Sequence, residues 1–255
     1  MSGSIASSAM AMQCLLSSLN ILSLNTPFIS GIVVAAGQGK RFGLGIPKQF
    51  LKIKGQPLLA YTIDNLLKIG ILSELIIVVS DDRINSKELK ACLPLPSSVP
   101  IKIIAGGEHR QDSVFNGMQV IDSQAEIVVV HDGVRPFVMP ELVRETVRLC
   151  SEFDGAILAI PAVDTLKEVE DGQIIRTIER SRVWQAQTPQ TFRREVLERA
   201  YANARQNNII ATDDAMLVEL IGGKVAVVKS TPDNLKITCQ NDLKIAKSIL
   251  KLREP

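Results

Sequence analysis

The chain has 255 residues, of which 46% are hydrophobic and 22% charged, with a formal net charge of +2. This composition is typical of a globular protein, and the length suits one α/β domain with an ample core. The small net charge argues against nucleic-acid binding, and the presence of only two histidines excludes a histidine-rich metal site. The four cysteines form no Cys-x-x-Cys pair, so we expect reduced thiols and a cytoplasmic protein.

The N-terminal segment, residues 1–28, carries no charged side chain, and the first charge in the chain is Lys40. Polar residues interrupt its apolar stretch and it has no basic start, so it fits neither a secretory signal nor a membrane span. It is serine-rich like a transit peptide, but it lacks the arginines of one. We expect a disordered or dispensable extension, or a start codon assigned too early, with organelle targeting as the alternative. Residues 29–255 are expected to form one domain.

A phosphate-binding turn is predicted near the start of this domain. Residues Ile32 to Ala35 form a β-branched apolar run that indicates a buried strand. The run leads into Ala36-Gly37-Gln38-Gly39, whose small residues let the backbone approach a ligand, and the cations Arg41 and Lys48 follow. Exposed N–H groups and fixed positive charges together suit a polyphosphate. The turn is neither a Walker loop nor a dinucleotide fingerprint, because Phe42 stands where the latter needs a third glycine.

Apolar segments with strand and helix periods alternate along the rest of the chain. We expect strands over residues 75–79, 101–105, 127–130, 156–160 and 224–229, and helices over 58–69, 82–92, 112–121, 140–151, 193–205 and 242–252. This rhythm predicts an α/β fold with a doubly wound, mostly parallel sheet. The carboxyl ends of parallel strands share one edge, where such folds bind ligands. Gly37, Gly107 and Asp132, which each follow a strand, are therefore expected to meet there.

One segment breaks the alternation. Residues 165–178 place Asp171-Gly172 between two β-type runs, which is a strong signal for a β-hairpin. A two-stranded hairpin alone is only marginally stable in water, so we expect it to pack against something. A second subunit is the natural candidate, and folding back onto its own domain is the alternative. The whole protruding arm is expected to span about residues 162–184.

Five motifs occur in a fixed order along the chain. They are Ala35–Arg41 with Pro47-Lys48-Gln49, then Gly106–Val114, His131–Pro136, Gln187–Gln190 and Asn234–Thr238. The first resembles the A-A-G-x-G-x-R and P-K-Q signature of nucleotidyltransferases. The ordered set, over roughly residues 30 to 252, resembles the 2-C-methyl-D-erythritol 4-phosphate cytidylyltransferases. The resemblance implies a Rossmann-like nucleotidyltransferase fold and transfer of the cytidylyl group of CTP to methylerythritol phosphate, with release of pyrophosphate, in the non-mevalonate route to isoprenoid precursors.

The resemblance also implies roles for individual residues. The catalytic cations would be Arg41, Lys48 and Lys236. Binding of CTP would fall to Ala35, Ala36, Gly37, Gly39, Gly107, Glu108, Arg110 and Ser113. Binding of the acceptor would fall to Asp132, Arg135, Thr165, Arg180 and Thr188, with Thr165 and Arg180 reaching in from the partner's arm in a homodimer.

A magnesium ion is also implied, held by Asp132. One or two carboxylates suffice for Mg²⁺ when phosphates complete its coordination shell. The alternative for Asp132 is a helix or turn cap. The implied substrates are small molecules, and neither nucleic acid nor membrane is expected as a partner.

Other functions compete with this interpretation. Ribitol 5-phosphate cytidylyltransferases share the fold and most of the motifs, but Arg180–Trp184 and Ala211–Ala215 favour methylerythritol phosphate. A uridylyl or other sugar nucleotidyltransferase is disfavoured by the segment Gly106–Val114, which fits the cytidylyl group. A catalytically dead nucleotide-binding regulator is disfavoured because the cations and Asp132 are all retained. Pyrophosphate release with CTP separates an enzyme from such a regulator.

Overall fold

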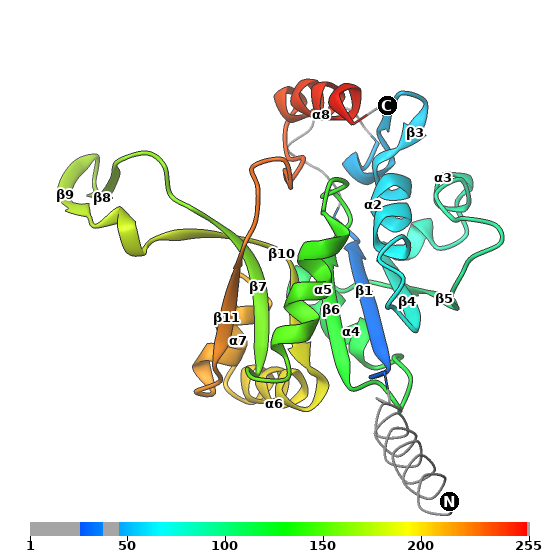
Figure 1. Ribbon diagram of the computed structural model, residues 1–255, viewed down its shortest axis with the longest axis horizontal. Coiled ribbons are helices and arrows are strands. Elements are labelled where there is room, and N and C mark those ends of the chain that lie inside the picture. The colour runs from blue at the N-terminus through cyan, green and yellow to red at the C-terminus, as the bar shows by residue number, and fades with distance from the viewer. Residues whose placement is uncertain (1–25, 38–45, 254–255) are drawn as a thin grey trace, which may run out of the picture.

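The computed structural model describes residues 26–37 and 46–253, and its main feature is a mixed sheet (Figure 1). The strand order of this seven-stranded sheet is β11-β7-β10-β6-β1-β4-β5. The bounds are β1 (Ile29–Ala35), β4 (Glu74–Val79), β5 (Ile101–Ala105), β6 (Ile127–Asp132), β7 (Gly155–Pro161), β10 (Trp184–Arg193) and β11 (Val225–Lys229). Two short pairs lie outside it, β2 (Lys52–Ile53) with β3 (Gln56–Pro57) and β8 (Leu166–Glu170) with β9 (Gln173–Ile178).

Helices cover both faces of the sheet, as the doubly wound prediction requires. The side chains of α2 (Leu58–Leu67), α3 (Lys87–Lys90) and α5 (Pro140–Leu149) belong to one hydrophobic cluster. Those of α4 (Arg110–Met118), α6 (Arg194–Gln206) and α7 (Asp214–Leu220) belong to a second cluster, on the opposite face. The last helix, α8 (Gln240–Leu252), packs on a third cluster with β2 and the start of α2. Within residues 26–37 and 46–253, no helix is long and apolar enough to span a bilayer.

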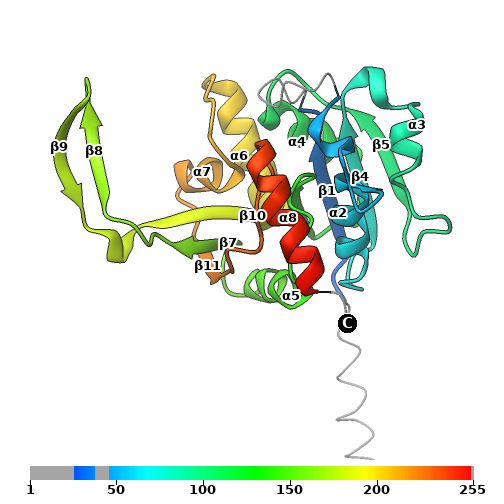
Figure 2. The ribbon, with the colours of Figure 1, turned by 90° about the horizontal axis from the view of Figure 1, so that it is seen from above.

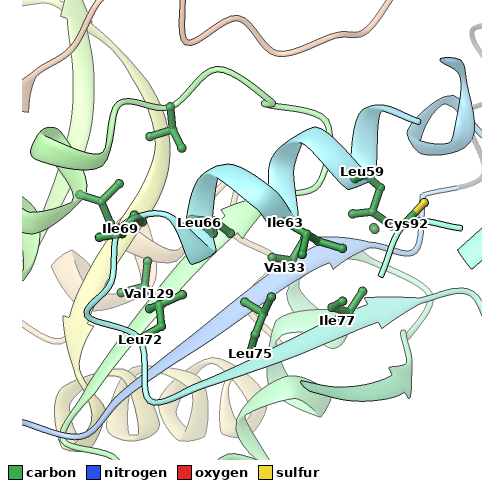
Figure 3. Close-up of a cluster of buried hydrophobic side chains, with 14 of the residues drawn as sticks. Val33, Leu59, Ile63, Leu66, Ile69, Leu72, Leu75, Ile77, Cys92 and Val129 are labelled. Atoms are coloured by element: carbon green, nitrogen blue, oxygen red, sulfur yellow. The ribbon is translucent and has the colours of Figure 1, made fainter. Parts of the chain in front are cut away.

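The first hydrophobic cluster shows why the strands are apolar throughout. Figure 3 shows α2 lying across β1 and β4, with Ile63 and Leu66 directed at Val33 and Leu75. The neighbouring residue Ile32 belongs to the cluster on the other face. Central parallel strands are buried on both faces, so they lack the polar alternation of a half-exposed strand. This arrangement aligns the carboxyl ends of β1, β4, β5 and β6 along one edge.

The strand β10 was missed by the sequence analysis. It lies between β6 and β7 and runs antiparallel to both. Its buried stretch carries Gln187, Thr188, Gln190 and Thr191, so it has no apolar run to reveal a central strand. Their burial is tolerated because each side chain forms a hydrogen bond with a neighbouring strand, helix or loop.

The predicted helix over residues 82–92 was also wrong in extent. The chain forms a 3-10 turn, η3 (Asp81–Arg83), and then the single turn α3. The side chain of Ser86 accepts a hydrogen bond from the backbone N–H of Leu89, which starts a new helix at this point. The other predicted helices occur with ends that differ by at most three residues.

The predicted hairpin arm is present and stands away from the sheet (Figures 1 and 2). Asp171 and Gly172 have φ angles of 48° and 78°, as a tight turn of this hairpin type requires. The strands of the arm leave Val169 (55% exposed), Ile174 (64%) and Ile175 (55%) open to solvent. The hairpin therefore does not fold back onto the described part of its own chain.

Candidate active site

A cavity of about 680 Å³ opens at the carboxyl ends of the parallel strands. The predicted residues that line it are Ala35, Ala36, Gly37, Lys48, Gly107, Glu108, Arg110, Ser113, Asp132 and Lys236. Gly39 and Arg41 fall in the segment 38–45, which lies outside the described residues. The turn after β1, the turn after β5 and the end of β6 therefore meet, as the strand order predicts.

The turn after β1 is fastened by Gln49, which the sequence analysis did not name as a site residue. Gln49 lies in the 3-10 helix η2 (Lys48–Phe50) and is 1% exposed. Its Nε2 donates to the carbonyl oxygens of Ala35 at 2.6 Å and of Gly37 at 3.1 Å. The turn is thus fixed against η2, and Lys48 is placed at the wall of the cavity beside it.

The turn after β5 packs directly against the turn after β1. The hydroxyl group of Ser113 accepts a hydrogen bond from the N–H of Gly107 at 3.2 Å and donates one to the carbonyl of His109 at 3.1 Å. A side chain on Gly106 would collide with that of Ala36, so only glycine lets the two turns approach this closely. The two backbone turns thus form one continuous cavity wall.

Arg110 joins this wall to two carboxylates. Its Nε donates to Oδ1 of Asp132 at 3.1 Å, and its Nη1 donates to Oδ2 of Asp214 at 2.8 Å. Asp214 is 1% exposed and also accepts a hydrogen bond from the hydroxyl of Tyr201 at 2.6 Å. From the sequence, Asp214 stood out only as part of the segment Ala211–Ala215, whereas in the structure it is the second anchor of Arg110.

Asp132 is the electrostatic centre of the cavity. Its Oδ2 lies 2.8 Å from Nζ of Lys236 and 3.5 Å from Nε of Arg135, while its Oδ1 faces Arg110. Burial alone would raise the pKa of Asp132, but the cations Arg110, Lys236 and Arg135 hold that pKa far below its usual range. The group is therefore an ionised carboxylate with oxygen ligands that suit a hard cation. Among the described residues, no cluster of three or more histidine, cysteine, aspartate or glutamate side chains could hold a metal.

Arg135 and Thr188 lie directly behind Asp132 and do not line the cavity. Arg135 is 8% exposed, and its Nη1 donates to the carbonyl of Asn234 at 2.7 Å. Thr188 is 5% exposed, and its Oγ1 accepts from the backbone N–H of Asp132 at 3.0 Å. The cis peptide bond Thr188-Pro189 lies within β10.

Thr165 and Arg180 are exposed at the base of the arm, outside the cavity of their own chain. Arg180 lies in the 3-10 helix η4 (Arg180–Arg182), and its Nη1 donates to the carbonyl of Val163. The structure of one chain therefore does not bring these two residues to the other site residues.

Three comparisons place the chain among known proteins. A model of the family described as 2-C-methyl-D-erythritol 4-phosphate cytidylyltransferase matches residues 29–252. Proteins of that name from Clostridioides difficile and Syntrophus aciditrophicus are 38% and 40% identical, covering 88% and 89% of this chain and 94% and 98% of their own lengths. The crystal structure of 4-diphosphocytidyl-2C-methyl-D-erythritol synthase from Anaerococcus prevotii superposes with a TM-score of 0.79 at 30% identity, covering 89% of this chain and 99% of that one. The chain therefore belongs to the 2-C-methyl-D-erythritol 4-phosphate cytidylyltransferase family.

Proposed function

We propose that this chain transfers the cytidylyl group of CTP to 2-C-methyl-D-erythritol 4-phosphate, giving 4-diphosphocytidyl-2-C-methyl-D-erythritol and pyrophosphate. The observation that carries the proposal is the arrangement of Lys48, Arg110 and Lys236 around one cavity that also holds the carboxylate of Asp132. Its volume of about 680 Å³ lies in the range of small-molecule sites, and it sits where α/β sheets bind nucleotides. Family membership supports the choice of acceptor.

The reaction is a displacement at the α-phosphorus of CTP. A phosphate oxygen of the acceptor attacks, a new P–O bond forms, and the bond to the pyrophosphate group breaks with its electron pair leaving on pyrophosphate. The attacking phosphate is already ionised, so no strong general base is required. Catalysis then consists of bringing two anions together and stabilising the charge that grows on the leaving group. Lys48 and Lys236 fit this role, and Arg41 is proposed as a third cation.

The residues of the cavity fit a magnesium ion that is shared with the substrate. Asp132 offers an ionised carboxylate, and phosphate oxygens would complete a shell that Mg²⁺ accepts with few protein ligands. A bound ion would neutralise charge on the triphosphate. Oδ2 of Asp132 contacts Lys236 and Oδ1 contacts Arg110, so an ion held by this carboxylate would compete with these contacts.

A homodimer completes the proposed site. The arm carries exposed apolar side chains on Val169, Ile174 and Ile175, and a free two-stranded hairpin is marginal in water. Thr165 and Arg180 lie at the base of the arm, so a partner chain that covers the arm would also contact these two residues. We propose that these two residues bind the acceptor in the partner's cavity.

A reducing, cytoplasmic compartment suits the cysteines. Cys92, Cys150 and Cys239 are free thiols, and the first two are buried. Burial raises the pKa of both Cys92 and Cys150 to about 12, so neither is a reactive thiolate at neutral pH. Free thiols persist where the environment is reducing.

The proposed function is tested by measuring pyrophosphate release with each of the four ribonucleoside triphosphates. We expect release with CTP and Mg²⁺ only when methylerythritol phosphate is present, and at least about tenfold less with UTP, because the site would be built for one base. Equal rates with UTP, or release that does not depend on the acceptor, would contradict a cytidylyltransferase.

A further inference from the structure

Four residues behind Asp132 form a closed ring of hydrogen bonds. Nε2 of His131 lies 3.0 Å from the carbonyl oxygen of Arg135, and Nη1 of Arg135 donates to the carbonyl oxygen of Asn234 at 2.7 Å. Nδ2 of Asn234 donates to the carbonyl oxygen of Thr188 at 2.9 Å. The hydroxyl of Thr188 lies 3.0 Å from Nδ1 of His131 and closes the ring. Each member therefore bonds through its side chain to the next.

The position of each proton in this ring follows from the chemistry of its partners. A carbonyl oxygen can only accept, so Nε2 of His131 carries the hydrogen. The imidazole is 0% exposed, which favours its neutral form and leaves Nδ1 as an acceptor. The hydroxyl of Thr188 must then donate to Nδ1, while its oxygen accepts from the N–H of Asp132. Thr188 consequently has no proton left to offer to a substrate.

The ring connects the chain segments that carry Asp132, Arg135 and Lys236. His131 and Asp132 end β6, Thr188 lies in β10, and Asn234 precedes Lys236 by two residues. A further backbone hydrogen bond, from the N–H of Ile237 to the carbonyl of Val134 at 3.0 Å, holds the Lys236 segment against the turn after β6. The distance of 2.8 Å between Lys236 and Asp132 is thus set by this framework.

We propose that His131 and Asn234 are positioning residues for cytidylyl transfer, which hold Arg135 and Lys236 in place relative to Asp132. This inference rests on the proposed function, because that function assigns Lys236 to the reacting phosphates. Neither residue lines the cavity, and both are buried, at 0% and 1% exposed. Loss of one member leaves the partner groups without their hydrogen bonds and lets Arg135 or the Lys236 segment move. A displacement of about 1 Å is enough to reduce turnover by about a hundredfold.

The kinetic test uses His131→Phe and Asn234→Ala, with Thr191→Val as a matched control. Thr191 is equally buried and its hydroxyl bonds to Thr146 at 2.8 Å, away from the ring. We expect both ring variants to lose at least about tenfold in kcat and in kcat/KM for the acceptor. The KM for CTP should change by less than about threefold, because Gly107 and Ser113 lie outside the ring. Thr191→Val should lower the melting temperature but keep kcat.

Two comparisons show whether the ring acts as a unit. In the double variant of His131→Phe and Asn234→Ala, the loss should be close to that of the more severe single variant, since one break already opens the ring. Thr188→Val should lose at least about tenfold relative to Thr188→Ser, which keeps the hydroxyl. The proposal would be overturned if the loss in the double variant equalled the product of the two single losses. Equal activity of the two Thr188 variants would overturn it as well.

A spectroscopic test does not depend on activity. The chain contains two histidines, so the ¹⁵N imidazole signals of His131 can be assigned by their loss in His131→Phe. We expect the imidazole proton on Nε2, which faces the carbonyl of Arg135. A proton on Nδ1, which faces the hydroxyl of Thr188, would contradict the hydrogen-bond ring. An inactive wild-type protein with the Nε2 tautomer would instead refute the proposed function and leave the ring in place.

Discussion

Nζ of Lys236 lies 2.8 Å from Oδ2 of Asp132, although the two residues come from distant parts of the sequence. The lysine side chain is 40% exposed and the aspartate side chain 7%, so the cation is on the cavity side of the pair. A half-exposed cation can be shared with an incoming phosphate at little cost, because water already solvates part of it. Under the proposed function, the pair would link the resting charge balance of the cavity to the arrival of the reacting phosphate.

The cations beside the glycine turn should be essential for turnover. We expect Lys48→Ala and Arg41→Ala each to lower kcat by at least about a hundredfold, as loss of a phosphate-stabilising cation does in comparable transfers. Steady-state pyrophosphate release measures this effect. The melting temperature should change little, because replacing a charged side chain outside a hydrophobic core seldom has a large effect on stability.

Lys52→Ala is the control for Lys48→Ala, since Lys52 is exposed on β2 and does not line the cavity. It should retain wild-type kcat. Near-normal turnover of Lys48→Ala would show that Lys48 does not stabilise the reacting phosphorus.

The shared site of the proposed homodimer can be tested by complementation. A mixture of inactive Lys48→Ala and Arg180→Ala proteins should regain part of the wild-type activity after subunit exchange. A heterodimer contains one cavity with an intact Lys48 and an intact arm from the other chain. Activity is measured before and after a cycle of mild denaturation and refolding.

The matched control mixes Lys48→Ala with Lys236→Ala. Both positions line the same cavity of the same chain, so no heterodimer has an intact site and no activity should return. Recovery in this control, or a monomer by light scattering, would speak against the shared site.

His131 should make stability depend on pH. Burial lowers the pKa of His131 from 6.5 to about 4 in the folded protein. Below pH 6.5 the unfolded chain binds a proton that the folded chain does not, so the free energy of unfolding falls as the pH falls through this window. The contribution amounts to about 2 kcal/mol between pH 7.5 and pH 5. Urea unfolding at both pH values should show a loss about 2 kcal/mol larger for the wild type than for His131→Phe, and equal losses would disprove the effect.

The N-terminal extension should be dispensable. Deletion of residues 2–26 should leave kcat and the melting temperature nearly unchanged, because this segment contains no motif and no charge. Residues 1–25 lie outside the described structure. A large fall in melting temperature on deletion would mean that the segment packs on the domain.

The sequence predicts the cavity well because strand ends and turns are local features. Gly37, Gly107 and Asp132 each follow an apolar run, and right-handed crossovers bring such turns to one edge. The Asp171-Gly172 turn is equally local, since its φ angles suit few other residue pairs. In each case a short stretch of sequence carries the whole signal.

The sequence does not reveal interactions that depend on distant partners. Asp214 meets Arg110 across 104 residues, and Asn234 meets Arg135 across 99 residues. The strand β10 escaped prediction because most of its buried residues are polar and find their hydrogen-bond partners far away in the sequence. Asn234 belongs to the motif Asn234–Thr238. That motif pointed to the segment, but it assigned a role only to Lys236 and none to the side chain of Asn234.

The choice of acceptor is the central claim, and kcat/KM for 2-C-methyl-D-erythritol 4-phosphate against ribitol 5-phosphate, at equal CTP and Mg²⁺, tests it most directly. Both acceptors offer the same phosphate to the cations, so selectivity must come from the polyol. A hydroxyl left unpaired in a buried site costs about 1–3 kcal/mol, or roughly ten- to a hundredfold. We expect at least about tenfold preference for methylerythritol phosphate on this basis. Equal values, or a preference for ribitol 5-phosphate, would contradict the proposed function.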